Sequence, residues 1–138
     1  MKNIAVLYLR DNGIEYIDEA IAAWNHLRIL DLSQNSLESL PEGLYNCKEL
    51  VSINLSNSQR LTKFSNQLGN LTHLKTLNCS MCLELQELPL SIGNLKHLEI
   101  LLLYKCEKLF SMPEELADCE SLQNLNCYMC SSLKVLPT

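Results

Sequence analysis

The spacing of leucine and isoleucine constrains this chain more than any other feature. A run of the form Leu-x-x-Leu-x-Leu, with Ile or Cys at some positions, begins at six places separated by 23, 23, 24, 24 and 24 residues: Ile4, Leu27, Leu50, Leu74, Leu98 and Leu122. A fixed period of this length is typical of solenoids, in which each repeat packs only against its neighbours. We therefore expect a single domain over residues 1–138, with five full repeats and a truncated sixth.

The alternation within each run predicts a short strand with its leucines turned inward and the residues between them turned outward. Successive strands then stack in parallel at about 4.8 Å and line a concave face. The return segment carries a Leu-Pro or Met-Pro step in most repeats, at Pro41, Pro89, Pro113 and Pro137. Because proline donates no hydrogen bond, long helices are excluded there and extended or short helical convex segments are expected. The predicted class is an α/β solenoid.

Four further rows of apolar residues recur in register and are expected in the interior. They are Ile14, Leu37, Leu61, Leu85, Leu109, Leu133; Ile17, Leu40, Phe64, Leu88, Met112, Leu136; Ile21, Leu44, Leu68, Ile92, Leu116; and Trp24, Cys47, Leu71, Leu95, Cys119. Cys47 and Cys119 replace leucine and are expected to act as packing residues.

The turn after each strand changes character along the chain. Asn12 and Asn35 stand there first, and an inward amide would satisfy buried backbone groups of the loop. From the fourth repeat, Cys82, Cys106 and Cys130 take this place, and these repeats carry one more residue before the next leucine. Ser58, with the longer spacing, makes the third repeat intermediate.

These motifs resemble a known family, the leucine-rich-repeat proteins. Cys82-Leu-Glu-Leu85-Gln-Glu-Leu88-Pro89 and Cys106-Glu-Lys-Leu109-Phe-Ser-Met112-Pro113 are similar to the C-x-x-L-x-x-L-P repeats of plant intracellular nucleotide-binding immune receptors. The first two repeats resemble Ras-binding-type intracellular leucine-rich-repeat scaffolds. The resemblance implies a non-catalytic module for protein–protein interaction, the recognition part of a larger immune or signalling protein.

Composition excludes several other classes of function. The net charge of −5 and the absence of a Lys/Arg run argue against nucleic-acid binding, which depends on cations that neutralise phosphates. No apolar run is long enough to span a bilayer. Seven cysteines, an odd number that the repeat already explains, predict free thiols and a cytoplasmic protein.

Two cysteine pairs and two histidines could suggest a metal site. Cys79 and Cys82, with Cys127 and Cys130, form two C-x-x-C motifs 48 residues apart, so the pairs lie two strands apart, about 10 Å. Zinc thiolates must lie within roughly 4 Å of one another, so packing and turn roles are favoured. His73 and His97 are adjacent in the stack without a third ligand. We expect no metal, cofactor or catalytic site, and no enzyme.

The outward strand residues predict where a protein partner binds. They form three columns: Val6, Ile29, Ser52, Thr76, Ile100, Asn124; Tyr8, Asp31, Asn54, Asn78, Leu102, Asn126; and Arg10, Ser33, Ser56, Ser80, Tyr104, Tyr128. The first four repeats are mostly small and polar here. Apolar and aromatic residues gather in repeats four to six, a composition typical of protein interfaces. The predicted partner-binding residues are Met81, Ile100, Leu102, Tyr104, Lys105, Tyr128 and Met129.

Self-assembly is the alternative function. The repeats begin directly at Ile4 and stop just past a Leu-Pro turn, so neither end strand has a polar cap. Unpaired parallel edges recruit other strands. The chain is therefore expected either to be a piece of a longer protein or to pair end to end as a homo-oligomer.

Overall fold

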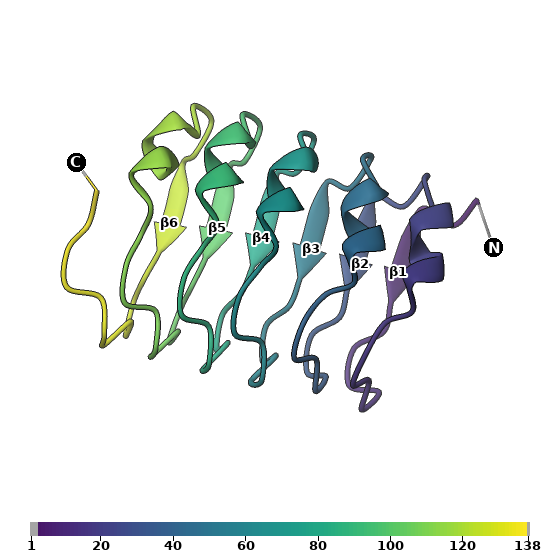
Figure 1. The fold of residues 1–138 in the computed structure, drawn as a ribbon, viewed down its shortest axis with the longest axis horizontal. Coiled ribbons are helices and arrows are strands. Elements are labelled where there is room, and N and C mark those ends of the chain that lie inside the picture. The colour runs from purple at the N-terminus through teal and green to yellow at the C-terminus, as the bar shows by residue number, and fades with distance from the viewer. Residues whose placement is uncertain (1–2, 138) are drawn as a thin grey trace.

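The computed structural model describes residues 3–137, and within them six three-residue strands form one sheet (Figure 1). The strands are β1 (Val6–Tyr8), β2 (Ile29–Asp31), β3 (Ser52–Asn54), β4 (Thr76–Asn78), β5 (Ile100–Leu102) and β6 (Asn124–Asn126). Each pairs in parallel with the next along the chain, and Leu7, Leu30 and Ile53 are aligned partners. The predicted stack of repeats, with like residues in rows, is confirmed.

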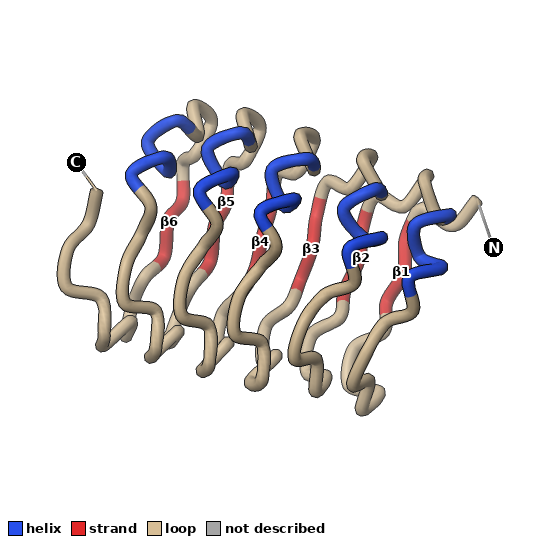
Figure 2. The backbone as a smooth tube through the Cα atoms, in the orientation of Figure 1, coloured by secondary structure: helices blue, strands red, loops and turns tan. Residues whose placement is uncertain are grey.

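Short helices line the opposite side of the sheet, as Figure 2 shows in blue. Among the described residues they are 3₁₀ helices of five residues each: η1 (Glu19–Ala23), η2 (Glu42–Asn46), η3 (Asn66–Asn70), η4 (Leu90–Asn94) and η5 (Glu114–Asp118). Pro41, Pro89 and Pro113 directly precede three of them in extended conformation. Asp18 and Ser65 take that place before η1 and η3 and accept a hydrogen bond from the first turn. The expectation of short helical convex segments is confirmed.

The core runs between sheet and helices along the whole stack. The predicted interior rows are buried in repeats two to five, as at Leu37, Leu68 and Leu95. The end repeats differ, because each has a neighbour on one side only. Leu136 was expected in the core but is 56% exposed, and Trp24 is only half-buried.

Asn35 shows why an amide follows the strand in the 23-residue repeat. Its Oδ1 accepts from the backbone N–H groups of Asn12 at 3.0 Å and Ile14 at 2.9 Å. Its Nδ2 donates to the carbonyls of Leu9, Leu32 and Ser33. The side chain thus satisfies loop groups of its own repeat and the preceding one. Asn12, also expected to point inward, is instead exposed, since no repeat of the described chain precedes it.

The 24-residue repeats satisfy this loop in a different way. The extra residue allows a backbone turn, in which the N–H of Leu85 donates to Cys82 O at 3.1 Å and that of Leu109 to Cys106 O at 3.2 Å. Where cysteine stands at this place, the side chain then has one carbonyl left to satisfy, whereas the Oγ of Ser58 in the third repeat is buried without a partner. Cys82 donates to Leu55 O at 3.3 Å and Cys106 to Cys79 O at 3.1 Å. A thiol is sufficient because backbone groups within the 24-residue loop already hydrogen-bond to one another.

The cysteines of the helical side have a second role that the sequence did not reveal. Cys47 and Cys119 are buried as predicted, but each also donates to the carbonyl of the preceding helix, Ile21 O at 3.3 Å and Ile92 O at 3.1 Å. All seven cysteines carry free thiols. Burial raises the pKa of Cys106 to about 12 and that of Cys127 to about 11. These two thiols therefore stay protonated at neutral pH.

Tyr45 fills a gap between the second and third repeats. The equivalent places in the next two repeats are Gly69 and Gly93, where an added Cβ would lie 2.6 or 2.7 Å from a backbone oxygen of the following repeat. Tyr45 is buried, and its hydroxyl accepts from Ser65 N at 3.4 Å. Burial raises the pKa of Tyr45 to about 12. The helices must therefore be further apart at this junction than at the glycines.

Candidate protein-binding surface

The outward residues of the strands form aligned columns on the concave side of the sheet. The register pairs Ile29 with Ser52, Ser52 with Thr76, and Thr76 with Ile100. It likewise pairs Asn54 with Asn78 and Asn78 with Leu102. The central residue of each of the strands β2 to β5 is buried and its two neighbours are half-exposed.

Most residues of the central column brace the backbone of their own repeat. The Oδ1 atoms of Asp31, Asn54, Asn78 and Asn126 accept from the N–H group two residues ahead, at 2.9 to 3.0 Å. Asp31 also accepts from the Ser33 hydroxyl at 2.6 Å. Ser33 was expected to lie open on the concave face, but it is buried, because its small side chain is drawn against Asp31.

Leu102 departs from this pattern. It pairs with Asn78 on one side and Asn126 on the other, yet it has no atom that could accept the N–H group of Tyr104. The central column thus gives up a structural hydrogen bond at β5 and gains an apolar, half-exposed side chain. A residue that sacrifices a local bond in this way is a candidate for recognition.

Tyr104 and Tyr128 form a stacked pair beside Leu102. Their ring centroids lie 5.8 Å apart and their planes differ by 8°. Tyr104 is half-buried, whereas Tyr128 is 69% exposed. Parallel stacking between successive repeats presents a flat aromatic surface, and such rings supply much of the binding energy at protein interfaces.

Met81, Lys105 and Met129 share an unusual backbone conformation. All three have positive φ, at 61°, 59° and 61°, as do Asp11, Gln34 and Asn57 in the earlier repeats. The turn after each strand requires this left-handed residue, which costs roughly 1–2 kcal/mol for a side chain other than glycine. Met129 is exposed, and Met81 and Lys105 are half-exposed. Together with the other predicted partner-binding residues, these three lie on successive repeats. We call Met81, Ile100, Leu102, Tyr104, Lys105, Tyr128 and Met129 the C-terminal cluster.

A second apolar area at the other end of the concave face was missed from the sequence. It consists of Val6, Tyr8, Ile29 and Val51, which we call the N-terminal patch. Val6 is 44% and Tyr8 69% exposed, while Ile29 and Val51 are half-exposed. Val6, Ile29 and Val51 line a shallow hollow together with Ala5 and Arg28. Val51 could have signalled this patch, but it lies one residue before its strand and outside the three columns.

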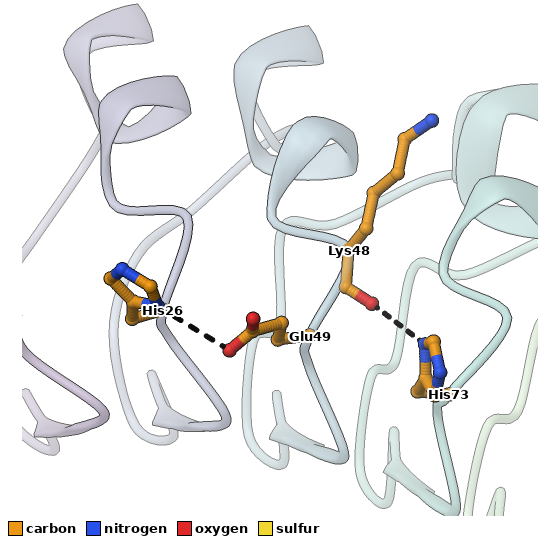
Figure 3. Close-up of polar contacts among 4 residues, drawn as sticks. All are labelled: His26, Lys48, Glu49 and His73. Carbon is orange, nitrogen blue, oxygen red and sulfur yellow. Dashed lines mark hydrogen bonds and ion pairs between the residues drawn. The ribbon is translucent and has the colours of Figure 1, made fainter.

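His26 and His73 each contact a residue of a neighbouring repeat (Figure 3). His26 lies 3.7 Å from the carboxylate of Glu49. His73 Nδ1 is 3.1 Å from Lys48 O, and the rings of His73 and His97 stack with centroids 6.3 Å apart. Each therefore links two repeats. Between residues 3 and 137, no three His, Cys, Asp or Glu side chains are grouped for a metal ion.

The two C-x-x-C motifs form the same turn two repeats apart. The N–H of Cys82 donates to Cys79 O, and that of Cys130 to Cys127 O, both at 3.2 Å. Cys79 and Cys82 are fully buried. Cys127 was expected to fill the core as Cys79 does, but it is only half-buried, because β6 ends the sheet. Leu101 lies on β5 between the motifs, Leu103 directly follows that strand, and both are buried.

Comparison with known proteins agrees with this architecture. A leucine-rich-repeat family profile matches residues 2–59. The leucine-rich-repeat ectodomain of the receptor kinase SOBIR1 from Arabidopsis thaliana is 20% identical, with a TM-score of 0.68 over 95% of this chain and 71% of that one. The fold is a leucine-rich-repeat solenoid.

Two other solved structures share the leucine-rich-repeat fold. The domain of the type III effector XopL is 16% identical, with a TM-score of 0.54 over 99% of this chain and 64% of its own length. The ectodomain of the Arabidopsis thaliana receptor kinase GASSHO1/SCHENGEN3, in complex with CASPARIAN STRIP INTEGRITY FACTOR 2, is 24% identical, with a TM-score of 0.53. That match covers 90% of this chain and 18% of the ectodomain. No curated protein matches the sequence.

Leucine-rich-repeat domains commonly mediate protein–protein interaction and are typically non-catalytic scaffolds. Over residues 3–137, every helix falls short of the length and apolar character needed to cross a membrane.

Proposed function

We propose that this leucine-rich-repeat solenoid is a non-catalytic module that binds a protein partner through its concave face, with the C-terminal cluster as the principal contact. The observation that carries the proposal is the stacked pair of Tyr104 and Tyr128 beside Leu102. The other central-column residues of β2 to β6 are Asn or Asp and brace the backbone. The apolar and aromatic side chains of the C-terminal cluster do not provide this bracing hydrogen bond to the backbone.

A partner would bury the exposed apolar surface of this cluster. Full burial of a side chain such as leucine contributes about 1.5–3 kcal/mol, and aromatic residues at the centre of interfaces often dominate affinity. The Lys105 side chain adds a cation at the edge of the apolar area. This arrangement suits a protein surface with a central apolar or aromatic side chain and an acidic neighbour.

The double variant Leu102→Asn with Tyr104→Ser tests the proposal. Asn is the residue that brackets this position in β4 and β6, so the variant should keep its fold and gain the missing bond to residue 104. Affinity capture with wild type and variant should yield a protein retained by wild type alone. Its direct titration should then show at least a tenfold loss of affinity for the variant. Equal affinity with intact folding would contradict the proposal.

Leu101→Asp and Tyr16→Ser serve as the two controls. Leu101 is fully buried, so a carboxylate there should unfold the repeat and abolish binding without information on the surface. Tyr16 is 78% exposed and lies outside the concave columns, so its loss should leave affinity unchanged. A large stability loss in the concave double variant would mean that the two faces of the strands were assigned wrongly.

We further propose that the module is the recognition part of a larger immune or signalling protein that acts in the cytoplasm. The C-x-x-L-x-x-L-P repeats support the immune assignment by resemblance, and free thiols suit a reducing compartment. Imaging of a fluorescent fusion to the native full-length protein tests the location. Accumulation outside the cytoplasm would contradict this part.

Self-assembly is the second candidate function. Within residues 3–137, β1 and β6 each pair on one side only, and Leu125 is 39% exposed on β6. At the opposite end, Leu7, Leu9, Ile17 and Trp24 help to line an apolar hollow of about 210 Å³. One copy's C-terminal end could cover this hollow on another, and such head-to-tail contact builds open arrays. Light scattering over a hundredfold range of concentration should show growing mass, whereas a constant monomer mass would refute assembly.

A further inference from the structure

We infer that the concave face binds an extended, acidic peptide segment that crosses the strands and places two apolar side chains, four or six residues apart, on the N-terminal patch and the C-terminal cluster. This inference rests on the proposed function and specifies the chemistry of the partner. It uses the N-terminal patch, which the proposed function does not require.

The spacing of the two apolar areas sets the length of the segment. Ile29 on β2 and Ile100 on β5 stand in one column, three strand spacings apart, which is about 14 Å. Tyr8 on β1 and Leu102 on β5 stand four spacings apart, about 19 Å. An extended chain advances about 3.3 Å per residue, so these distances correspond to about four and six residues. Because side chains alternate along an extended chain, an even separation points both anchors at the sheet.

The surface between the two areas can bind a peptide backbone. Asn54 and Asn78 use their Oδ1 atoms for the N–H groups of Ser56 and Ser80, which fixes the orientation of both amides. Their Nδ2 groups donate to no acceptor within residues 3–137. They lie on neighbouring strands, about 4.8 Å apart. An extended segment has free carbonyl groups along its length, and these are the acceptors that the two amides require.

Charge favours an acidic segment. Arg10, Arg28, Lys75 and Lys105 border the concave strip, and none of them forms an ion pair in the described part of the chain. Asp31 keeps its negative charge although it accepts from Ser33, so the opposing charges are Asp11, Asp31 and Glu99, one fewer than the four cations. The whole chain has a net charge of −5, so this face is less acidic than the remainder. Carboxylates beside the anchors would therefore be attracted here, and more strongly at low salt.

A library of random 12-residue peptides displayed on phage and selected on the immobilised chain tests the inference directly. Enriched peptides should carry two apolar residues four or six positions apart and an excess of Asp and Glu. A synthetic peptide from this pool should lose at least tenfold in affinity when one residue is inserted between its anchors. Selection of single-anchor peptides, no preference for even spacing, or no enrichment would overturn the inference.

Variants separate this inference from the proposed function. Tyr8→Ser changes a residue that is 69% exposed and should preserve the fold, and Ile29→Asn removes the second anchor contact. Each should weaken the selected peptides several-fold, as Leu102→Asn with Tyr104→Ser does at the other end, while Tyr16→Ser should not. If only the C-terminal variant weakens binding of the natural partner and of the peptides, the proposed function stands and the two-anchor inference is wrong. If neither end matters, both are wrong.

Discussion

Replacing Asn35 by Cys tests whether repeat length decides the residue that follows the strand. The sequence itself makes this exchange at Cys82, Cys106 and Cys130, so the substitution looks conservative from the pattern alone. The structure predicts otherwise. The introduced thiol could keep one bond, to Leu9 O, as Cys82 keeps its bond to Leu55 O. It would lose the bonds accepted from Asn12 and Ile14, because the 23-residue loop has no backbone turn to replace them.

The expected cost follows from the groups left without partners. The N–H of Ile14 is part-buried and loses its acceptor, at about 1–3 kcal/mol. The N–H of Asn12 is close to water and costs less, while the carbonyls of Leu32 and Ser33 lose a donor each. The total loss should be about 2–4 kcal/mol of unfolding free energy. For a chain of this length, that lowers Tm by about 6–12 °C.

Thermal and urea unfolding monitored by circular dichroism measure the difference. Cys82→Ser is the matched control, because Ser58 already stands at the equivalent place of a 24-residue repeat. We expect this control to lose no more than about 1 kcal/mol. If Asn35→Cys and Cys82→Ser cost the same, the loop length does not set the requirement for an amide. The explanation of the Asn-to-Cys change would then be refuted.

Three further predictions concern the central column, the helix contacts and the thiols. Asn78→Leu should lower the free energy of unfolding by about 1 kcal/mol in urea denaturation, because it removes the hydrogen bond accepted from Ser80 N–H. Leu102→Asn should be neutral or stabilising, and the opposite order of the two variants would refute the bracing role. Gly69→Ala should cost about 1–3 kcal/mol, since its Cβ would lie 2.6 Å from Ser91 O, while Ala117→Gly at the equivalent place should cost no more than about 1 kcal/mol. Raising the pH from 8 to 10 should lower stability, because burial raises the pKa of the Cys106 thiol from 9.0 to about 12. The folded state, which holds this thiol protonated, is favoured below pH 9, and it progressively loses that advantage as the pH rises toward 12. The loss from this thiol should be about 1 kcal/mol at pH 10, and Cys106→Ala should remove that part; an unchanged pH profile would contradict it.

Much of the fold could be predicted because each repeat meets its neighbours at equivalent positions. The 23- or 24-residue period placed Leu7, Leu30 and Ile53 in one row, and the strand pairing confirms that row. The prolines correctly indicated short convex helices. Ile100, Leu102, Tyr104 and Tyr128 were chosen from the columns, Met81, Lys105 and Met129 follow the last column, and the structure places all seven on neighbouring repeats. Their role in binding remains a prediction.

Several features of the candidate surface depended on contacts that cross between repeats. The sequence predicted that Leu102 is exposed, but it did not reveal that Asn78 and Asn126, the aligned residues on either side, brace the backbone. The hydrogen bond that is lost with leucine at this position was therefore not apparent. It also gave no sign that Met81 and Lys105 occupy left-handed turns. The N-terminal patch was overlooked because Val51, one residue before β3, lies outside the three columns, although it lines one hollow with Val6 and Ile29.

The period of the sequence by itself determined the stack, the inward rows and the concave columns, because a one-dimensional array repeats the same hydrophobic requirement in every coil. Only the tertiary structure decided which side chains satisfy the backbone between coils and how far the end repeats open to solvent. Those outcomes depend on distances of a few tenths of an ångström between one repeat and the next, as at Asn35 and Gly69. A pattern of residue types specifies which groups are neighbours, but hydrogen bonds and close packing depend on how near they come.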